Sequence, residues 1–148
     1  AAVALKESSV RWGKETTVAD GDYGVYAEYN CYIEADGTCF GSFADDACLV
    51  RHNSTVNMPY CRFLGGAHDG LSLVYGSNGS ASNCYGSNLV GACVNINHAS
   101  SLFANSCHLQ KSTYGFAATQ CSYINATSCT YSSNTYNIAT YETGYIAY

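Results

Sequence analysis

The chain has 148 residues and a formal net charge of −5, and its length fits one domain. Charged residues make up 11% of it, against about a quarter in ordinary soluble domains, whereas 47% are hydrophobic and 14% aromatic. This composition excludes a disordered chain, a collagen-like chain and a coiled coil. The excess of acids argues against a nucleic-acid partner, because a phosphate backbone would be repelled rather than neutralised.

Alternation of apolar and polar residues is the clearest structural signal, and it predicts strands along most of the chain. Turn signals separate strands at 36–37 and 76–79. Segments 43–50 and 98–110 instead show helix-like spacing of apolar residues. The predicted strands, in chain order, cover 10–12, 23–34, 48–52, 60–64, 71–75, 90–96, 121–124, 135–141 and 143–148.

These elements indicate a single β-rich domain over 1–148, and we expect an antiparallel, disulfide-stabilised β-sandwich-like domain with one or two short helices. Residues 1–12 are a candidate N-terminal extension or a strand donated to a neighbouring chain. The opening segment 1–5 lacks the layout of a signal peptide and is typical of a mature terminus after cleavage. No apolar run reaches the roughly 18 residues of a membrane span.

Nine cysteines are spaced too widely for the short Cys pairs of zinc sites. So many cysteines without a metal motif are typical of an oxidising compartment, so we expect disulfides and a secreted, extracellular protein. The odd number leaves one cysteine as a buried free thiol, a bridge to another chain or a reactive catalytic thiol. The candidates are Cys31, Cys39, Cys48, Cys61, Cys84, Cys93, Cys107, Cys121 and Cys129.

The C-terminal half carries almost no charge, since residues 70–148 hold only Lys111 and Glu142 among the charged residue types. Glycans could cover so neutral a surface, a partner or sibling chain could cover it, or the chain is simply rich in Ser and Asn. The sequons mark Asn53, Asn78 and Asn125 as N-glycosylation candidates.

Tyrosines are frequent near the C-terminus, and the first three of them are spaced by five residues, which does not indicate a repeat architecture. They reflect either β-propensity or a contact surface, because tyrosine has an apolar body and a polar tip. The interface candidates are Tyr131, Tyr136, Tyr141, Tyr145 and Tyr148.

One short segment has the features of an active loop: residues 65–70 form a glycine-bracketed loop in which His68 stands beside Asp69. His68 there is a candidate general base, although the same residue types are ordinary turn chemistry. The four histidines show no helical metal-ligand spacing, so we expect no metal and no cofactor.

A calcium site is the alternative use of the acidic residues in the N-terminal half. The segment 20–24 begins like a calcium loop but fails the EF-hand pattern. Asp36, Asp45 and Asp46 could converge with it in space, and the other interpretation is a solvated acidic face.

The leading interpretation is therefore a non-enzymatic secreted protein that associates with itself as a structural subunit of an extracellular filament, coat or matrix. The first alternative is a monomeric secreted effector, toxin or recognition protein, and the second is a small secreted hydrolase that uses His68. The expected partner is another copy, another extracellular protein or a glycan, and neither nucleic acid nor a membrane span is expected.

Overall fold

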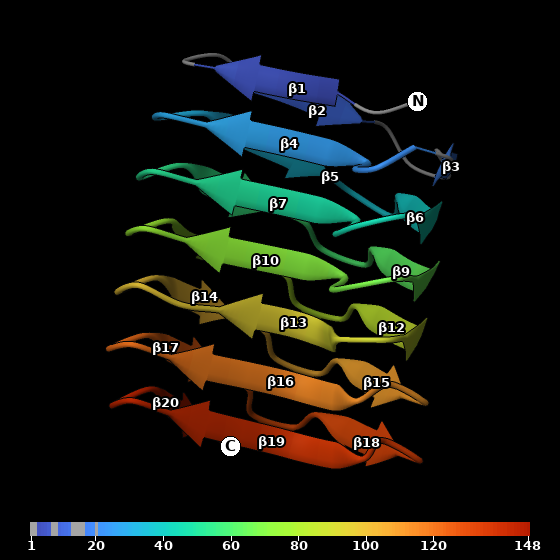
Figure 1. Ribbon diagram of the computed structural model, residues 1–148, viewed down its shortest axis with the longest axis vertical. Coiled ribbons are helices and arrows are strands. Elements are labelled where there is room, and N and C mark those ends of the chain that lie inside the picture. Colours follow the sequence, from blue (N-terminus) through green and yellow to red (C-terminus); the bar gives the residue numbers. More distant parts are fainter. Residues whose placement is uncertain (1–2, 7–8, 13–16, 20) are drawn as a thin grey trace.

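The computed structural model describes the chain apart from residues 1–2, 7–8, 13–16 and 20, and it shows a stack of parallel coils (Figure 1). Each full coil contributes one strand to each of three sheets. The strand orders are β1-β4-β7-β10-β13-β16-β19, β2-β5-β8-β11-β14-β17-β20 and β18-β15-β12-β9-β6-β3. All pairings between described strands are parallel.

The first sheet contains β1 (Val3–Lys6), β4 (Val25–Glu28), β7 (Cys48–Arg51), β10 (Leu71–Val74), β13 (Ala92–Ile96), β16 (Tyr114–Thr119) and β19 (Tyr136–Tyr141). The second contains β2 (Ser9–Trp12), β5 (Tyr32–Ala35), β8 (Thr55–Asn57), β11 (Asn78–Ser80), β14 (Ser101–Phe103), β17 (Tyr123–Asn125) and β20 (Tyr145–Ala147). The third contains β3 (Thr17–Ala19), β6 (Cys39–Phe43), β9 (Arg62–Gly66), β12 (Tyr85–Leu89), β15 (His108–Gln110) and β18 (Thr130–Ser132).

Equivalent residues recur every 22 or 23 positions, so the same type of side chain stacks from coil to coil. The register pairs Val25 with Cys48, Cys48 with Leu71 and Leu71 with Val94. All four of these side chains are buried in the single core that the three sheets enclose. Each coil therefore buries its apolar face only against its neighbours, as in other repeat proteins.

From β4 onward, the corners between the first and second sheets each use two consecutive residues with positive φ. Tyr29 and Asn30 form the corner after β4, with φ of 61° and 56°, and equivalent pairs recur down the stack. This left-handed conformation is costly for most residues and turns the chain within two positions. The ring of His52 stacks there between Tyr29 and Tyr75, with centroids 4.6 and 4.9 Å apart.

This architecture corrects the expected antiparallel β-sandwich, because the strands are parallel and belong to three sheets around one core. The described residues contain no helix: 98–110 includes β14 and β15, and 43–50 runs from the end of β6 into β7. The buried residues within 98–110 follow strand alternation rather than helix spacing. Leu102 and Ala104 are buried before the corner, and Cys107 and Leu109 are buried after it, with more exposed residues between them.

The predicted strand over 23–34 is divided by a corner into β4 and β5. The described parts of segment 1–12, β1 and β2, pair in register with β4 and β5 of the same chain. No helix among the described residues is long and apolar enough to cross a membrane.

The expectation of a disulfide-rich protein is also corrected, because all nine cysteines are free thiols in the structure. Six of them are buried, and each of the thiols of Cys61, Cys84 and Cys107 donates a hydrogen bond to a backbone carbonyl. Hydrogen bonds between coils and the shared apolar core stabilise this fold in place of the expected disulfides.

Candidate functional site

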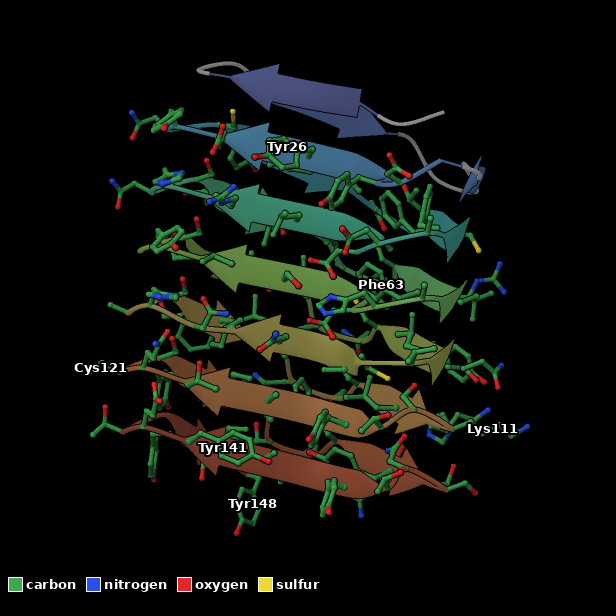
Figure 2. The ribbon with its side chains drawn as sticks, in the orientation of Figure 1. Tyr26, Phe63, Lys111, Cys121, Tyr141 and Tyr148 are labelled. Carbon is green, nitrogen blue, oxygen red and sulfur yellow. The ribbon has the colours of Figure 1, made fainter. Side chains whose placement is uncertain are left out.

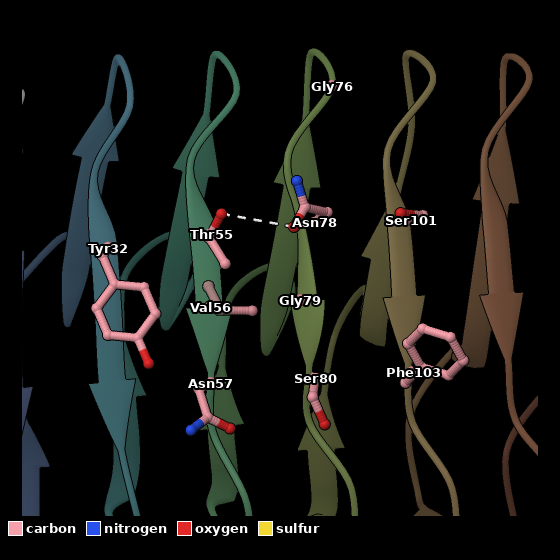
Figure 3. Close-up of a pocket in the computed structure, with 10 residues that line it drawn as sticks. All are labelled: Tyr32, Thr55, Val56, Asn57, Gly76, Asn78, Gly79, Ser80, Ser101 and Phe103. Carbon is pink, nitrogen blue, oxygen red and sulfur yellow. Dashed lines mark hydrogen bonds between the residues drawn. The ribbon is translucent and has the colours of Figure 1, made fainter.

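A groove of about 440 Å³ lies on the outer face of the second sheet, across β5, β8, β11 and β14 (Figure 3). It is open to solvent, and none of the described side chains that line it is charged. The lining residues are Tyr32, Thr55, Val56, Asn57, Gly76, Asn78, Gly79, Ser80, Ser101 and Phe103.

Strand geometry decides which side chains reach this groove. The middle residue of each short strand points into the core, as Val56 and Leu102 do, and the first and third residues point outward. The outward residues of β8 and β11 are polar and smaller, whereas Tyr32 on β5 and Phe103 on β14 are large. Because the smaller side chains of β8 and β11 lie between these two rings, the middle of the outer face of the second sheet is recessed and forms the groove.

Gly79 holds the floor of the groove close to the neighbouring strand. A Cβ at this position would lie 2.0 Å from the carbonyl oxygen of Val56 and 2.6 Å from Val56 Cγ2. The first contact is with backbone, which cannot rotate away. Only glycine therefore lets β11 lie this close to β8.

The groove combines aromatic walls with a neutral, hydrogen-bonding floor. The side chains of Tyr32 and Phe103 are 41% and 57% exposed, although aromatic rings usually bury much of their surface. Thr55 Oγ1 lies 3.5 Å from Asn78 Oδ1, so these two groups face solvent with only a weak mutual contact. Strands spaced by about 4.8 Å place the two walls about 14 Å apart across the strands, and Phe103 also lies two residues further along its strand than Ser101, the equivalent of Tyr32.

The aromatic surface continues beyond the groove toward the last coil. Tyr123 and Tyr145 follow Ser101 in the same outward column, paired in register across β14, β17 and β20. Their rings are stacked, with centroids 5.7 Å apart and planes 9° apart. The face therefore offers a run of polar positions with flat apolar rings at both ends.

The predicted active loop lies elsewhere, at the corner between the third and first sheets, where His68 and Asp69 follow β9. The fold brings them beside Asp45 and Asp46 of the preceding coil. His68 Nδ1 lies 2.5 Å from Asp46 Oδ1, 3.6 Å from Asp69 Oδ2 and 3.8 Å from Asp45 Oδ1. Three carboxylates therefore surround one half-exposed imidazole.

The buried carboxylate of Asp69 is engaged by the fold itself. It accepts hydrogen bonds from the Ala92 amide at 2.6 Å, the Asn95 side-chain amide at 2.8 Å and the Ser72 hydroxyl at 3.3 Å. These contacts hold adjacent coils together at the corner. Because they occupy the Asp69 carboxylate, it is not available to bind or activate a substrate. The Asp69 amide in turn donates to Asp46 Oδ1 at 3.0 Å.

His68 and Asp46 form a pair that retains a proton. The hydrogen bond to Asp46 raises the pKa of His68, and burial raises the pKa of the Asp46 carboxyl. A raised pKa makes His68 a poorer free base near neutral pH and favours the imidazolium. The geometry thus favours a charge-paired corner over the predicted general base.

Among the described residues, the ligand atoms of Asp45, Asp46 and His68 lie within 4.8 Å of one another, close enough for a cation. Asp45 also accepts the Tyr23 hydroxyl at 2.7 Å. Asp36, the other acid expected to converge, does not belong to this group. Residue 20 lies outside the described residues.

The remaining sequence candidates fall in different places. Asn53 and Asn78 are exposed, and Asn78 stands on the groove, whereas Asn125 has a buried Oδ1 without a hydrogen-bond partner. Tyr131 packs against the core, with its ring 6.0 Å from Phe116. Four tyrosines of the interface group are exposed: Tyr136, Tyr141, Tyr145 and Tyr148.

The buried thiols do not have the properties of a catalytic cysteine. Burial raises the pKa of Cys61 to about 12 and that of Cys93 to about 11. A reactive cysteine needs a lowered pKa and access to solvent. Cys121 is exposed but lies at a corner, on the opposite side of its coil from Lys111 (Figure 2).

Sequence reasoning missed most of the groove, including Tyr32, Thr55, Ser101 and Phe103. The signal that could have found it is the repeat length. Tyr32, Thr55, Asn78 and Ser101 are equivalent positions in four consecutive coils. Alignment of the chain at this period would have put them in one column.

Comparison with known proteins agrees with the observed fold. A family model described as "Right handed beta helix region" matches residues 1–131. No curated protein and no solved structure matches the chain. The family includes some hydrolases, so the match assigns an architecture and leaves the activity to be argued from the site.

Proposed function

The chain belongs to the right-handed β-helix family, and from this premise we propose that it is a carbohydrate-recognition protein whose binding site is the groove across β5, β8, β11 and β14. The observation that carries the proposal is a neutral, polar floor between two exposed aromatic walls on a rigid sheet face. This is a more specific form of the recognition role and of the glycan partner that the sequence suggested.

The aromatic walls suit the apolar face of a sugar ring. A pyranose presents C–H groups on its faces and hydroxyls around its edge, so it needs flat apolar contacts and hydrogen bonds at once. Tyr32 and Phe103 supply exposed rings, and the Tyr32 hydroxyl adds a polar group at one end. Exposed rings of this kind on a rigid element are typical of binding surfaces.

The floor suits the hydroxyl groups. The side chains of Asn57 and Asn78 each offer a carbonyl acceptor and an amide donor, and Thr55, Ser80 and Ser101 offer hydroxyls that can donate or accept. Sugar hydroxyls likewise do both. Because none of the described lining residues is positively charged and the net charge is −5, the groove disfavours phosphate and polyanionic ligands.

An extracellular setting is part of this proposal, because polysaccharides are abundant there. The argument for secretion from disulfides no longer applies, since the thiols are free. Support for the location comes instead from the ligand class and from a C-terminal half with almost no charge.

The test is binding of the reduced protein to a panel of neutral oligosaccharides, with calorimetry on the best ligand. Tyr32→Ala and Phe103→Ala are each expected to weaken binding at least tenfold, which corresponds to about 1.4 kcal/mol. Tyr60→Ala is the matched control, because Tyr60 is 61% exposed and does not line the groove. Equal losses in all three variants, or binding to none of the sugars, would refute the proposal.

Self-association is a second candidate, favoured by a group of exposed tyrosines near β19 and β20. Tyr136, Tyr141, Tyr145 and Tyr148 are between 50% and 82% exposed. Tyrosine has an apolar body and a polar tip, so it suits an interface that is wet before assembly. Two of them, Tyr141 and Tyr148, are labelled in Figure 2, and we propose a second copy as the occupant of this tyrosine surface.

Light scattering over a concentration series tests this second candidate. Oligomers are expected for the unmodified chain and monomers for Tyr136→Lys/Tyr141→Lys, because lysine replaces each apolar ring and places like charges on the two facing copies. Tyr60→Lys adds one positive charge away from the tyrosine surface and should leave the oligomers intact. A monomer at every concentration rules self-association out.

A further inference from the structure

Four thiols lie one above another inside the solenoid, at the corner that precedes the third sheet: Cys61, Cys84, Cys107 and Cys129. The residues that follow them pair in register along β9, β12, β15 and β18. Neighbouring cysteines are therefore separated by one strand spacing, about 4.8 Å. We call this column the thiol ladder.

The sulfur atoms of the thiol ladder all have the same orientation. Each S–H donates to a carbonyl oxygen 25 or 26 residues earlier, at distances between 2.9 and 3.1 Å. The Cys107 amide also donates to Cys129 Sγ at 3.3 Å. The sulfurs therefore follow one another along the solenoid axis, and an N–H points at a sulfur from the adjacent rung.

Access to the ladder comes through Cys129. Cys61, Cys84 and Cys107 are at most 3% exposed. Cys129 is only partly buried. A small ion can thus reach the Cys107–Cys129 rung without unfolding of the solenoid.

We propose that Cys107 and Cys129 bind a soft monovalent d¹⁰ ion, copper(I) or silver(I), as a two-coordinate pair of thiolates. Thiolates select soft ions of this class. Two metal–sulfur bonds of about 2.3 Å, the length typical of zinc thiolates, span about 4.6 Å in a straight line. This span matches the strand spacing of about 4.8 Å.

A linear site fits the ladder better than a tetrahedral zinc site. Zinc needs four ligands around one point, whereas rungs two apart are separated by about 9.6 Å. Among the described residues, the cluster of three or more potential ligands within reach of one ion is at Asp45, Asp46 and His68, and it includes no cysteine. Two thiols per ion is therefore the coordination that the ladder allows.

Binding is a simple exchange of protons for metal. Two S–H groups release their protons to solvent, two sulfur–metal bonds form, and no group is oxidised or reduced. The product carries one negative charge. The Cys107 amide hydrogen bond to Cys129 Sγ stabilises that charge. This inference uses residues outside the groove and does not depend on the proposed function.

The experiment is titration of the full, reduced chain with silver(I), and with copper(I) held by a chromophoric competitor, in the absence of oxygen. We expect one tightly bound ion per chain, an ultraviolet thiolate-to-metal absorption band and a higher thermal midpoint. Cys107→Ser and Cys129→Ser should each lower the affinity at least a hundredfold. Serine retains a donor for the carbonyl that each thiol contacts, so the fold should survive, and circular dichroism checks this.

Cys121→Ser is the matched control, because Cys121 is an exposed thiol outside the ladder. It should keep the tight site. The proposal is overturned if Cys129→Ser binds as tightly as the unmodified protein, if Cys121→Ser abolishes binding, or if the folded chain binds neither ion. X-ray absorption of the bound ion should show two sulfur neighbours, and a higher sulfur count would also contradict it.

Discussion

The orientation of two phenylalanines offers the sharpest test of the fold. Phe63 on β9 is fully buried, and its ring stacks on Phe40 of the preceding coil with centroids 5.8 Å apart. Phe103 on β14 faces solvent and is 57% exposed. The same substitution at these two positions should therefore have very different effects on stability.

Phe63→Ala removes a core ring and leaves a cavity that neighbouring coils cannot fill, which typically costs about 3–5 kcal/mol. The lost contact with Phe40 is part of that cost, since a stacked aromatic pair contributes about 0.5–1.5 kcal/mol. Phe103→Ala removes an exposed ring, and surface changes of this kind usually stay within about 0.5 kcal/mol.

Urea unfolding followed by circular dichroism measures both free energies of unfolding. Hydrogen exchange then shows whether the loss in Phe63→Ala spreads to adjacent coils, as expected for a protein whose coils stabilise one another. Similar losses in the two variants would refute the assigned inward and outward faces. A larger loss for Phe103→Ala would mean that the register of β14 is shifted by one residue.

Three further predictions concern a titration, a glycine and a thiol. His68→Gln should make the free energy of unfolding less dependent on pH. Because the pKa of His68 is raised in the folded chain, its pairing stabilises the fold fully below the unfolded pKa of about 6.5, and this stabilisation is lost as the pH rises through the folded pKa. The higher urea midpoint of the unmodified protein should therefore approach that of the variant as the pH rises above the folded pKa. An advantage that grows with pH would contradict the pairing with Asp46. Gly79→Ala should abolish sugar binding and cost more than about 1 kcal/mol, because its Cβ meets backbone; calorimetry and thermal unfolding check both, and a neutral result would contradict the close approach. Cys84→Ala should cost about 1–3 kcal/mol by leaving the Met58 carbonyl without its donor, and Cys84→Ser should cost less; urea unfolding that ranks serine below alanine would disprove the role of that hydrogen bond.

Local pattern was enough to locate many of the strands. The segments predicted over 48–52, 71–75 and 135–141 correspond to β7, β10 and β19. Period-two alternation is a property of single strands, so it can be read without knowledge of their neighbours. The alternation is visible in the structure, where Val25 and Ala27 of β4 and Ile33 and Ala35 of β5 are buried.

The sheet arrangement could not be read in that way. Alternation says nothing about whether the neighbouring strand is parallel or antiparallel, and the corners of this fold carry few of the usual hairpin glycines. Residues such as Tyr29 and His52 occupy the left-handed corner conformation instead. Because the repeat was not recognised, the nine cysteines were interpreted as disulfide partners rather than as residues at equivalent positions of successive coils.

A repeat signal was nevertheless present in the cysteines themselves. Cys61, Cys84, Cys107 and Cys129 recur at the coil period of 22 or 23 residues. An alignment at that period predicts a solenoid and turns the cysteines from bridge partners into one stacked column. The spacing was visible, but its meaning depended on comparison of whole coils rather than of adjacent residues.

The sequence by itself determined that this is a β protein with low charge, an aromatic surface and inward and outward faces on each strand. Only the tertiary structure decided which residues meet. Asp46 and His68 are separated by 22 positions, and Tyr32 and Phe103 by three coils, yet each pair belongs to one corner or one groove. The physical reason is that a solenoid forms its sites between coils, so contact follows the period of the stack and not proximity along the chain.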